Sequence, residues 1–132
     1  FIDMDLTHIK MQSATLDGSS FRDARLRLAD LRGSSLKKAV FSRADLSNTN
    51  LSGLKFDSPG GEGLRIQRTN LSGATMRYVN LNGANLRDAI LMGADLTGSN
   101  LDGCDLRKAD LTGAILSNVN LSAANTEGAI FD

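Results

Sequence analysis

Aromatic residues, proline, cysteine and histidine are scarce in this sequence of 132 residues. It has no tryptophan, one proline, one cysteine and one histidine, and aromatic residues make up 5% of it. A single cysteine excludes an internal disulfide framework, and a single histidine excludes His clusters. No apolar run approaches the ~20 residues of a membrane-spanning helix. We therefore predict a small aliphatic core and no membrane partner.

An excess of one charge sign is missing as well. Lys and Arg together number 15 and Asp and Glu together number 15, so the formal net charge is zero. This balance removes the simplest arguments for nucleic-acid binding and for strong acidic mimicry. We expect no nucleic-acid partner.

What the sequence does have is a repeat of five residues. Among the 27 positions 1, 6, 11 and so on to 131, large apolar residues occupy 25, the exceptions being Gly61 and Thr126. The residue two positions before these centres is Ala in 13 of 26 cases, and the residue directly before a centre is commonly Asp or Asn. The repeat unit is therefore A-(D/N)-L-x-x.

A period of five fits neither a helix, which repeats near 3.6 residues, nor a strand, which repeats near 2. Two inward residues in every five, one small and one large, fit a chain that turns a corner in each pentapeptide. Four such units close a square, so one coil takes four times five residues, or 20.

The segments ANLRD, ADLTG and CDLRK resemble the repeats of the pentapeptide-repeat family, and the resemblance covers nearly the whole chain. It implies an all-β fold, a right-handed quadrilateral parallel β-helix of about six to seven coils, in a single domain over residues 1–132. Functions within that family are diverse, so the resemblance transfers the fold better than the function.

Residues 20 apart are expected to stack in columns. We predict stacked rings for Phe1, Phe21 and Phe41. Two further columns are expected, one of asparagines that adds hydrogen bonds between coils and one of glycines at a turn with positive φ. The asparagines are Asn80, Asn100 and Asn120, and the glycines are Gly33, Gly53, Gly73, Gly93 and Gly113.

An irregular bulge is predicted at residues 57–64. Pro59 and its glycine neighbours cannot supply a normal inward pair, yet Phe56 and Ile66 are ten residues apart, which keeps the phase of five. We predict a deformed pentapeptide that is still counted, so that residues 20 apart stack throughout. The alternative, five residues looped out, rotates every later side by one. A structural irregularity is favoured over a recognition loop, and the segment lacks the Lys-Ser/Thr ending of a P-loop.

No group of residues indicates catalysis, a cofactor site or a metal site, so we predict a protein that is not an enzyme. His8 is expected at the surface, and Cys104 is expected as a buried structural thiol because it replaces the usual inward Ala. The aspartates that precede Leu are interpreted as turn formers. They are Asp30, Asp45, Asp95, Asp105 and Asp110.

Two surfaces are candidates for binding a protein. With 20-residue stacking, a basic stripe lies on the side of Leu26, Leu86 and Leu106. It is interpreted either as a solvated, salt-bridged face or as a docking site for an acidic partner. Its residues include Arg27, Arg65, Arg68, Arg87, Arg107 and Lys108. A second basic cluster is predicted from Lys37, Lys38, Lys55 and Arg77. The second surface is a flat polar side with the exposed apolar pair Ile90 and Met92, expected to share that side with Asn50, Ser52, Asn70 and Ser72.

These features predict a scaffold for protein–protein interaction or substrate recognition. The family resemblance extends to proteins that join such a solenoid to a BTB-type adaptor domain and to bacterial effectors with a ubiquitin-ligase region. A cytoplasmic location is expected, or secretion into a host cell for an effector. Because open coil ends expose unpaired backbone and apolar core, flanking domains or end-to-end self-association are expected to cover them.

The alternative function is mimicry of duplex DNA, as in the quinolone-resistance branch of the family, whose members bind DNA gyrase. Such mimicry needs a dense row of acids, because DNA carries one charge per ~1.7 Å of its axis. The most acidic predicted side has four acids and two arginines. They are Asp3, Asp23, Glu62 and Asp102, with Arg22 and Arg43.

Overall fold

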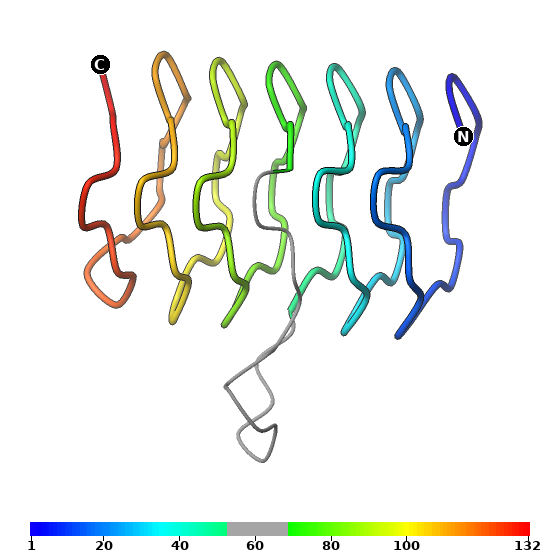
Figure 1. Ribbon diagram of the computed structural model, residues 1–132, viewed down its shortest axis with the longest axis horizontal. Helices are drawn as coiled ribbons and strands as arrows, with labels where there is room; N and C mark the ends of the chain where they lie inside the picture. Colours follow the sequence, from blue (N-terminus) through cyan, green and yellow to red (C-terminus); the bar gives the residue numbers. More distant parts are fainter. Residues whose placement is uncertain (53–68) are drawn as a thin grey trace.

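The computed structural model describes residues 1–52 and 69–132, and in these ranges the chain winds into a solenoid whose two termini lie at opposite ends (Figure 1). The described residues form no helix and no continuous strand. Neighbouring coils pair instead through isolated parallel β-bridges, such as the pairs Asp5–Arg25 and Arg25–Asp45. The offset of 20 residues in these pairs is the predicted length of one coil.

A tight turn follows each centre and makes the corner of the coil. The amide of Ala24, for example, donates to the carbonyl of Phe21 at 3.0 Å. The residue before that amide is left-handed, with φ of 61° at Asp23 and 65° at Gly73. Positive φ at the third residue is the geometry of a type II turn, which explains why polar residues and Gly follow the centres. Four such turns in each coil make the solenoid four-sided.

The core consists of the centres and the small residues two positions before them. Phe21, Leu26, Ala24 and Ala44 are almost wholly buried. The rings of Phe1 and Phe21 stack with centroids 4.8 Å apart, and those of Phe21 and Phe41 stack at 4.6 Å. These spacings match the ~4.8 Å between paired strands, and they confirm the predicted aromatic column.

The stacking register changes across residues 53–68. The bridges there are Val40–Asn70, Asp45–Thr75 and Asn50–Asn80. The offset between bridged residues is therefore 30 (70 − 40), so this coil contains ten more residues than a regular one. The prediction of unbroken 20-residue stacking was therefore wrong, and so was the alternative of five extra residues. Ten is two full periods of five, which leaves the phase of the centres unchanged. The predicted bulge at 57–64 lies outside the described residues.

This change turns every later pentapeptide by two sides relative to the prediction. The predicted glycine column is confirmed for Gly73, Gly93 and Gly113, which stack on the first side. Gly33 does not belong to it, because Gly73 stacks on Arg43, where a Cβ at Gly73 would lie 3.8 Å from the Arg43 Cγ. Gly103 stacks instead on Gly83, and Gly53 lies outside the described residues. The bridge between Asn80 and Asn100 confirms their stacking, and Asn50 precedes them in the same column. The side-chain oxygens of Asn80 and Asn100 accept from amides of their own turns, however, and not from the next coil as predicted.

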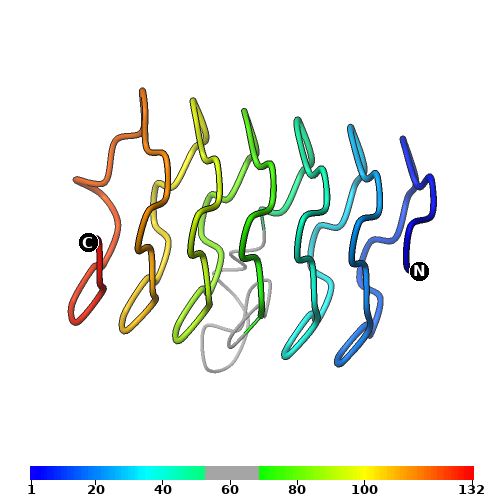
Figure 2. The same cartoon turned by 90° about the horizontal axis from the view of Figure 1, so that it is seen from above.

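Seen from above, the coils follow one another in a single row (Figure 2). We number the four sides of each coil by their centres, as the bridges align them. The first side has Phe1, Phe21, Phe41, Leu71, Leu91 and Leu111. The second side has Leu6, Leu26, Leu46, Met76, Leu96 and Leu116. The third side has Met11, Leu31, Leu51, Leu81, Leu101 and Leu121. The fourth side has Leu16, Leu36, Leu86, Leu106 and Thr126. Within one coil the second and fourth sides are opposite, because two corners separate them.

Apolar residues are exposed where the described solenoid starts and stops. Phe1 and Ile2 are exposed at one end, and Ile130 and Phe131 at the other. Coverage of these ends by flanking domains or by a second copy stays a prediction, as do the number of coils and the extent of the domain. None of the described residues belongs to a helix long and apolar enough to cross a membrane.

Candidate functional site

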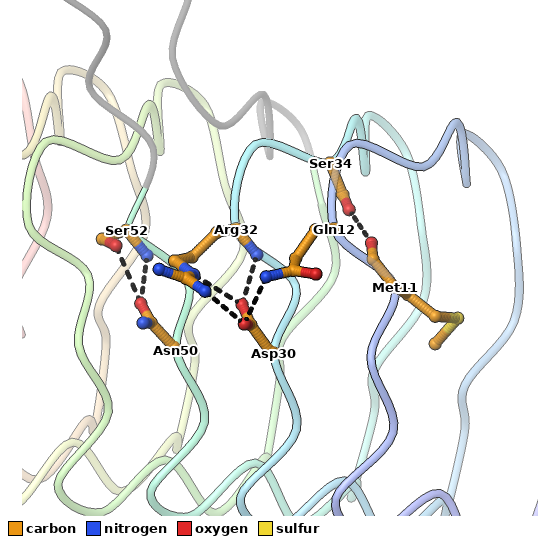
Figure 3. Close-up of polar contacts among 7 residues, drawn as sticks. All are labelled: Met11, Gln12, Asp30, Arg32, Ser34, Asn50 and Ser52. Atoms are coloured by element: carbon orange, nitrogen blue, oxygen red, sulfur yellow. Dashed lines mark hydrogen bonds and ion pairs between the residues drawn. The ribbon is translucent and has the colours of Figure 1, made fainter.

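The acidic and amide side chains that precede the centres are engaged in turns. In Figure 3, the carboxylate of Asp30 accepts from the backbone amide of Arg32, and the side-chain oxygen of Asn50 accepts from the amide of Ser52. Their neighbours do the same, which confirms the interpretation of the aspartates as turn formers. The aspartates in such turns are Asp30, Asp45, Asp95, Asp105 and Asp110.

Most of these carboxylates are held in their charged form. The Arg107 guanidinium donates two hydrogen bonds to Asp105, at 2.8 and 2.6 Å, and lowers the pKa of that carboxyl despite partial desolvation. The Thr97 hydroxyl lowers the pKa of Asp95 in the same way. A carboxyl with a lowered pKa is a poor proton donor near neutral pH, so these groups serve the fold.

Buried hydroxyl groups complete the turns of neighbouring coils. The Ser34 hydroxyl donates to the carbonyl of Met11 (Figure 3) and accepts from the amide of Ala14 at 3.2 Å. Ser99 makes the same bridge between the carbonyl of Met76 and the amide of Val79. Each serine thus replaces a direct turn hydrogen bond, and neither is placed as a nucleophile.

Cys104 is a buried structural thiol, as predicted. Its Sγ donates to the carbonyl of Leu81 at 2.7 Å, and burial raises the pKa of the thiol to about 12. A thiolate is the reactive form of cysteine, so this thiol is unreactive near neutral pH. Over residues 1–52 and 69–132, no cluster of three or more His, Cys, Asp or Glu side chains is placed to hold a metal ion.

The predicted basic stripe does not exist as one surface. Arg27 lies on the second side, whereas Arg87, Arg107 and Lys108 lie on the opposite, fourth side. The reason is the 30-residue register, which turns everything after residue 68 by two sides. Arg65, Arg68 and Lys55 lie outside the described residues.

The second predicted basic cluster is divided in the same way. Lys37 and Lys38 lie on the fourth side, which also carries Arg87, while Arg77 joins Arg27 on the second side. On the fourth side, Arg107 forms an ion pair with Asp105. This side is therefore a mixture of paired and solvated charges.

Ile90 and Met92 lie on the first side, flanking the buried centre Leu91. They are 38% and 45% exposed, which confirms the predicted exposure. β-bridges link Ile90 to Asp110 and Asp110 to Ile130, so a second exposed isoleucine follows in the same column. We call Ile90, Met92 and Ile130 the first-side patch.

The surroundings of the first-side patch are flat. Gly73, Gly93 and Gly113 form its edge and present no side chains. Asn70 and Ser72 lie on this side as predicted, but Asn50 and Ser52 lie on the third side, which corrects their predicted placement. Asp110, between the isoleucines, accepts from the amide and hydroxyl of Thr112.

Leu28 and Tyr78 form a second apolar feature, which was not predicted from the sequence. Leu28 and Tyr78 are 50% and 59% exposed, and both occupy the left-handed turn position of the second side. The available signal was a large apolar residue at a position that the repeat otherwise fills with Gly and with small or polar residues.

Comparison with solved structures identifies several similar folds. A pentapeptide repeat protein from the thylakoid lumen of Arabidopsis thaliana is 29% identical, with a TM-score of 0.59 over 84% of this chain and 70% of that chain. A pentapeptide repeat protein from the cyanobacterium Cyanothece is 24% identical, with a TM-score of 0.50 over 97% of this chain and 91% of that one. No curated protein sequence matches the chain.

The family model for pentapeptide repeats matches eight copies, over residues 1–37, 24–58, 62–91 and 89–128. These matches span most of the sequence and coincide with the five-residue turns seen in the solenoid. The chain therefore belongs to the pentapeptide-repeat family, whose members fold as right-handed quadrilateral β-helices.

Proposed function

We propose that this solenoid is a non-enzymatic scaffold that docks a protein partner on the first-side patch. The observation that carries the proposal is the exposure of Ile90 and Met92 beside an edge of glycines that present no side chains. Exposed apolar side chains grouped on a flat surface favour a protein contact, because burying them releases ordered water. Tight turns hold their positions fixed, so little conformational entropy is lost on binding.

The polar groups of the side define what the partner must offer. The carboxylate of Asp110 already accepts two hydrogen bonds from Thr112, so its burial under a partner requires few further hydrogen-bond donors. A partner surface that is apolar at its centre and carries hydrogen-bond donors at its rim fits this arrangement. The adaptor and effector contexts, and the cellular location, stay predictions.

Site-directed photocrosslinking in cells of the source organism tests the proposal. A photoreactive residue at Met92 is expected to capture a specific protein, and Ile90→Asp is expected to abolish the capture. The matched control places the same photoreactive residue at Ser52, on the third side. Equal capture from both positions, or capture that survives Ile90→Asp, would contradict the proposed use of the first side.

DNA mimicry is the less favoured alternative because the acids of the described sides are separated and paired. On the first side, the carboxylate of Asp23 accepts two hydrogen bonds from Arg43, at 2.8 and 2.9 Å. On the third side, Asp30 is paired in the same way with Arg32, and Asp102 stands near the opposite end. A mimic of DNA needs a continuous row of unpaired acids.

A further inference from the structure

We propose that the corner between the second and third sides binds an acidic peptide in which an apolar residue is flanked by acidic ones. We call this surface the arginine–tyrosine corner, and it consists of Arg27, Leu28, Asn48, Arg77 and Tyr78. The inference shares one assumption with the proposed scaffold function, which is that the ligand is a polypeptide. It assigns a partner chemistry to a surface other than the first-side patch.

The backbone conformation of Leu28 and Tyr78 is the first reason to assign a function here. Their φ angles are 60° and 57°, in the left-handed region that costs energy for residues other than Gly and Asn. Twelve residues other than Gly have positive φ in the described ranges, and Leu28 and Tyr78 are the only two with large apolar side chains. Half or more of the surface of each residue is exposed to solvent. Neither side chain therefore recovers this cost by burial in the core.

The register brings these two residues into one column. The amide of Leu28 donates to the carbonyl of Ser47 at 3.1 Å, and the amide of Asn48 donates to the carbonyl of Arg77 at 2.9 Å. Leu28, Asn48 and Tyr78 therefore follow one another in adjacent coils. At about 4.8 Å per coil, Leu28 and Tyr78 are roughly 10 Å apart along the axis, which leaves room above Asn48 for one apolar side chain of a ligand.

The ring of Tyr78 is held in place by its neighbour in the next coil. A Cβ at Gly98 would lie 2.6 Å from the Tyr78 Cε1 and 2.7 Å from its Cδ1, so the ring rests directly on this glycine. The ring is thus positioned before any ligand arrives while most of it stays in solvent. Preorganised aromatic side chains are efficient binding groups because they lose few rotamers on contact.

The charge that projects from this corner is positive. Arg27 and Arg77 share one column, and Ser47 between them is small and 7% exposed. Arg27 makes no ion pair within residues 1–52 and 69–132. Arg77 contacts Asp95 through its Nε at 3.6 Å, and its side chain stays 50% exposed.

Among the acids of the second side, only Asp95 contacts one of these arginines, Arg77. They lie at the middle of the side, where their carboxylates accept hydrogen bonds from turn groups two residues later. They are Asp5, Asp45 and Asp95. His8 and Arg25 complete the titratable groups of this side, and Arg25 lies 3.7 Å from Asp3. Arg27, and the exposed part of Arg77 beyond its contact with Asp95, therefore favour an anionic ligand.

An extended peptide fits this arrangement. Its side chains alternate in direction, so the two neighbours of an inserted apolar residue are about 7 Å apart on the opposite edge. Carboxylates at those two positions come within reach of Arg27 and Arg77, while the apolar residue lies between Leu28 and Tyr78. Arg also forms bidentate hydrogen bonds with carboxylates, which gives the site its preference for acidic residues.

Fluorescence anisotropy with a fluorescein-labelled peptide of repeated Glu-Leu-Glu units tests the proposal. We expect saturable binding at low salt, no binding of a Lys-Leu-Lys peptide, and at least tenfold weaker binding after Arg27→Glu. Tyr78→Asn is expected to weaken binding similarly. Because Asn tolerates positive φ, this variant should melt no earlier than the native protein, which separates a binding defect from a folding defect. The matched control for charge is Arg22→Glu on the first side, expected to bind normally.

Three results would overturn the inference. They are no binding of the acidic peptide to the native protein, equal binding by Arg27→Glu and native protein, and tighter binding of a labelled single-stranded oligonucleotide than of the peptide. The last result would assign the corner to nucleic acid, which also uses arginines and stacked aromatic rings. Ile90→Asp is expected to bind the peptide normally, so failure of this site and failure of the first-side patch are distinguishable.

Discussion

The ring of Tyr78 rests on Gly98 in the next coil, in a space that any Cβ at position 98 would occupy. Gly98→Ala is therefore expected to displace the ring. Tyr78 is the only tyrosine and the chain has no tryptophan, so intrinsic fluorescence and the ring proton shifts report on this one side chain. We expect both signals to change in Gly98→Ala.

Gly93→Ala is the matched control for this change. Gly93 has the same φ of 68° as Gly98, but a Cβ there would meet nothing within 4 Å. Both variants should lose roughly 1 kcal/mol of stability from the strained backbone, and only Gly98→Ala should alter the tyrosine signals. Equal tyrosine signals in the two variants would contradict the contact.

The aromatic column predicts how core substitutions rank. Phe21 is wholly buried between Phe1 and Phe41, so Phe21→Ala is expected to cost about 3–5 kcal/mol of unfolding free energy. Phe21→Leu should cost less, because Leu71, further along the column, shows that this side accepts a leucine. Chemical denaturation measures both, and a smaller loss for Ala than for Leu would contradict this packing.

The free energy of unfolding at acidic pH depends on the aspartates in the turns. Arg107 lowers the pKa of Asp105 in the folded protein, so the stabilising charge is fully present above the unfolded pKa near 4 and is lost as pH falls through the folded pKa. Asp105→Asn keeps an acceptor for the turn but removes the charge. We expect it to lose less stability than the native protein as the pH falls below about 4.

Thermal melts at a series of acidic pH values measure this difference. The control is Asp102→Asn, which removes a carboxylate that accepts no turn hydrogen bond among the described residues and leaves the pair of Asp105 and Arg107 intact. An identical acid profile for Asp105→Asn and native protein would show that the charge of Asp105 contributes nothing to stability.

Cys104 is expected to lower the stability of the folded protein at alkaline pH. Burial raises its pKa from near 9 to about 12, so the folded state holds the proton more tightly than the unfolded state. The stability is unaffected below pH ~9 and falls as the pH rises from there toward the folded pKa. Cys104→Ala removes the group at a position where the repeat usually has Ala, and it is expected to remove part of this alkaline loss.

Denaturation between pH 8 and 11 compares the two proteins, and thiol labelling gives an independent reading. At pH 8 the native thiol is expected to react only as fast as the protein unfolds, because the thiolate is the reactive form. Rapid labelling of fully folded protein would contradict the burial of Cys104.

The parts of the fold that could be predicted from sequence are those set by local, repeated chemistry. The inward positions, the stacked rings of Phe1 and Phe21, and the turns capped by residues such as Asp30 all follow from the five-residue unit. Each unit carries its own turn and its own inward pair, so the pattern needs no knowledge of distant contacts.

The placement of surface residues after position 68 could not be predicted in the same way. Ten extra residues between Asn50 and Asn80 leave the period unchanged but exchange opposite sides. Because of this exchange, Arg27 shares a column with Arg77 and lies on the side opposite to Arg87. Leu28 and Tyr78 were overlooked for the same reason, because they join one column only at the 30-residue offset.

The central claim is that Arg27 and Arg77 lie on one side of the solenoid while Arg87 lies on the opposite side. Nitroxide labels on paired cysteines test it in a Cys104→Ser background. Arg27→Cys with Arg77→Cys places the labelled backbones roughly 10 Å apart, so strong dipolar broadening of the EPR spectrum is expected. Arg27→Cys with Arg87→Cys, which lies half a coil further along the axis but on the opposite side, should show much weaker broadening. Stronger broadening for the pair at 27 and 87 would contradict the register and, with it, the arginine–tyrosine corner.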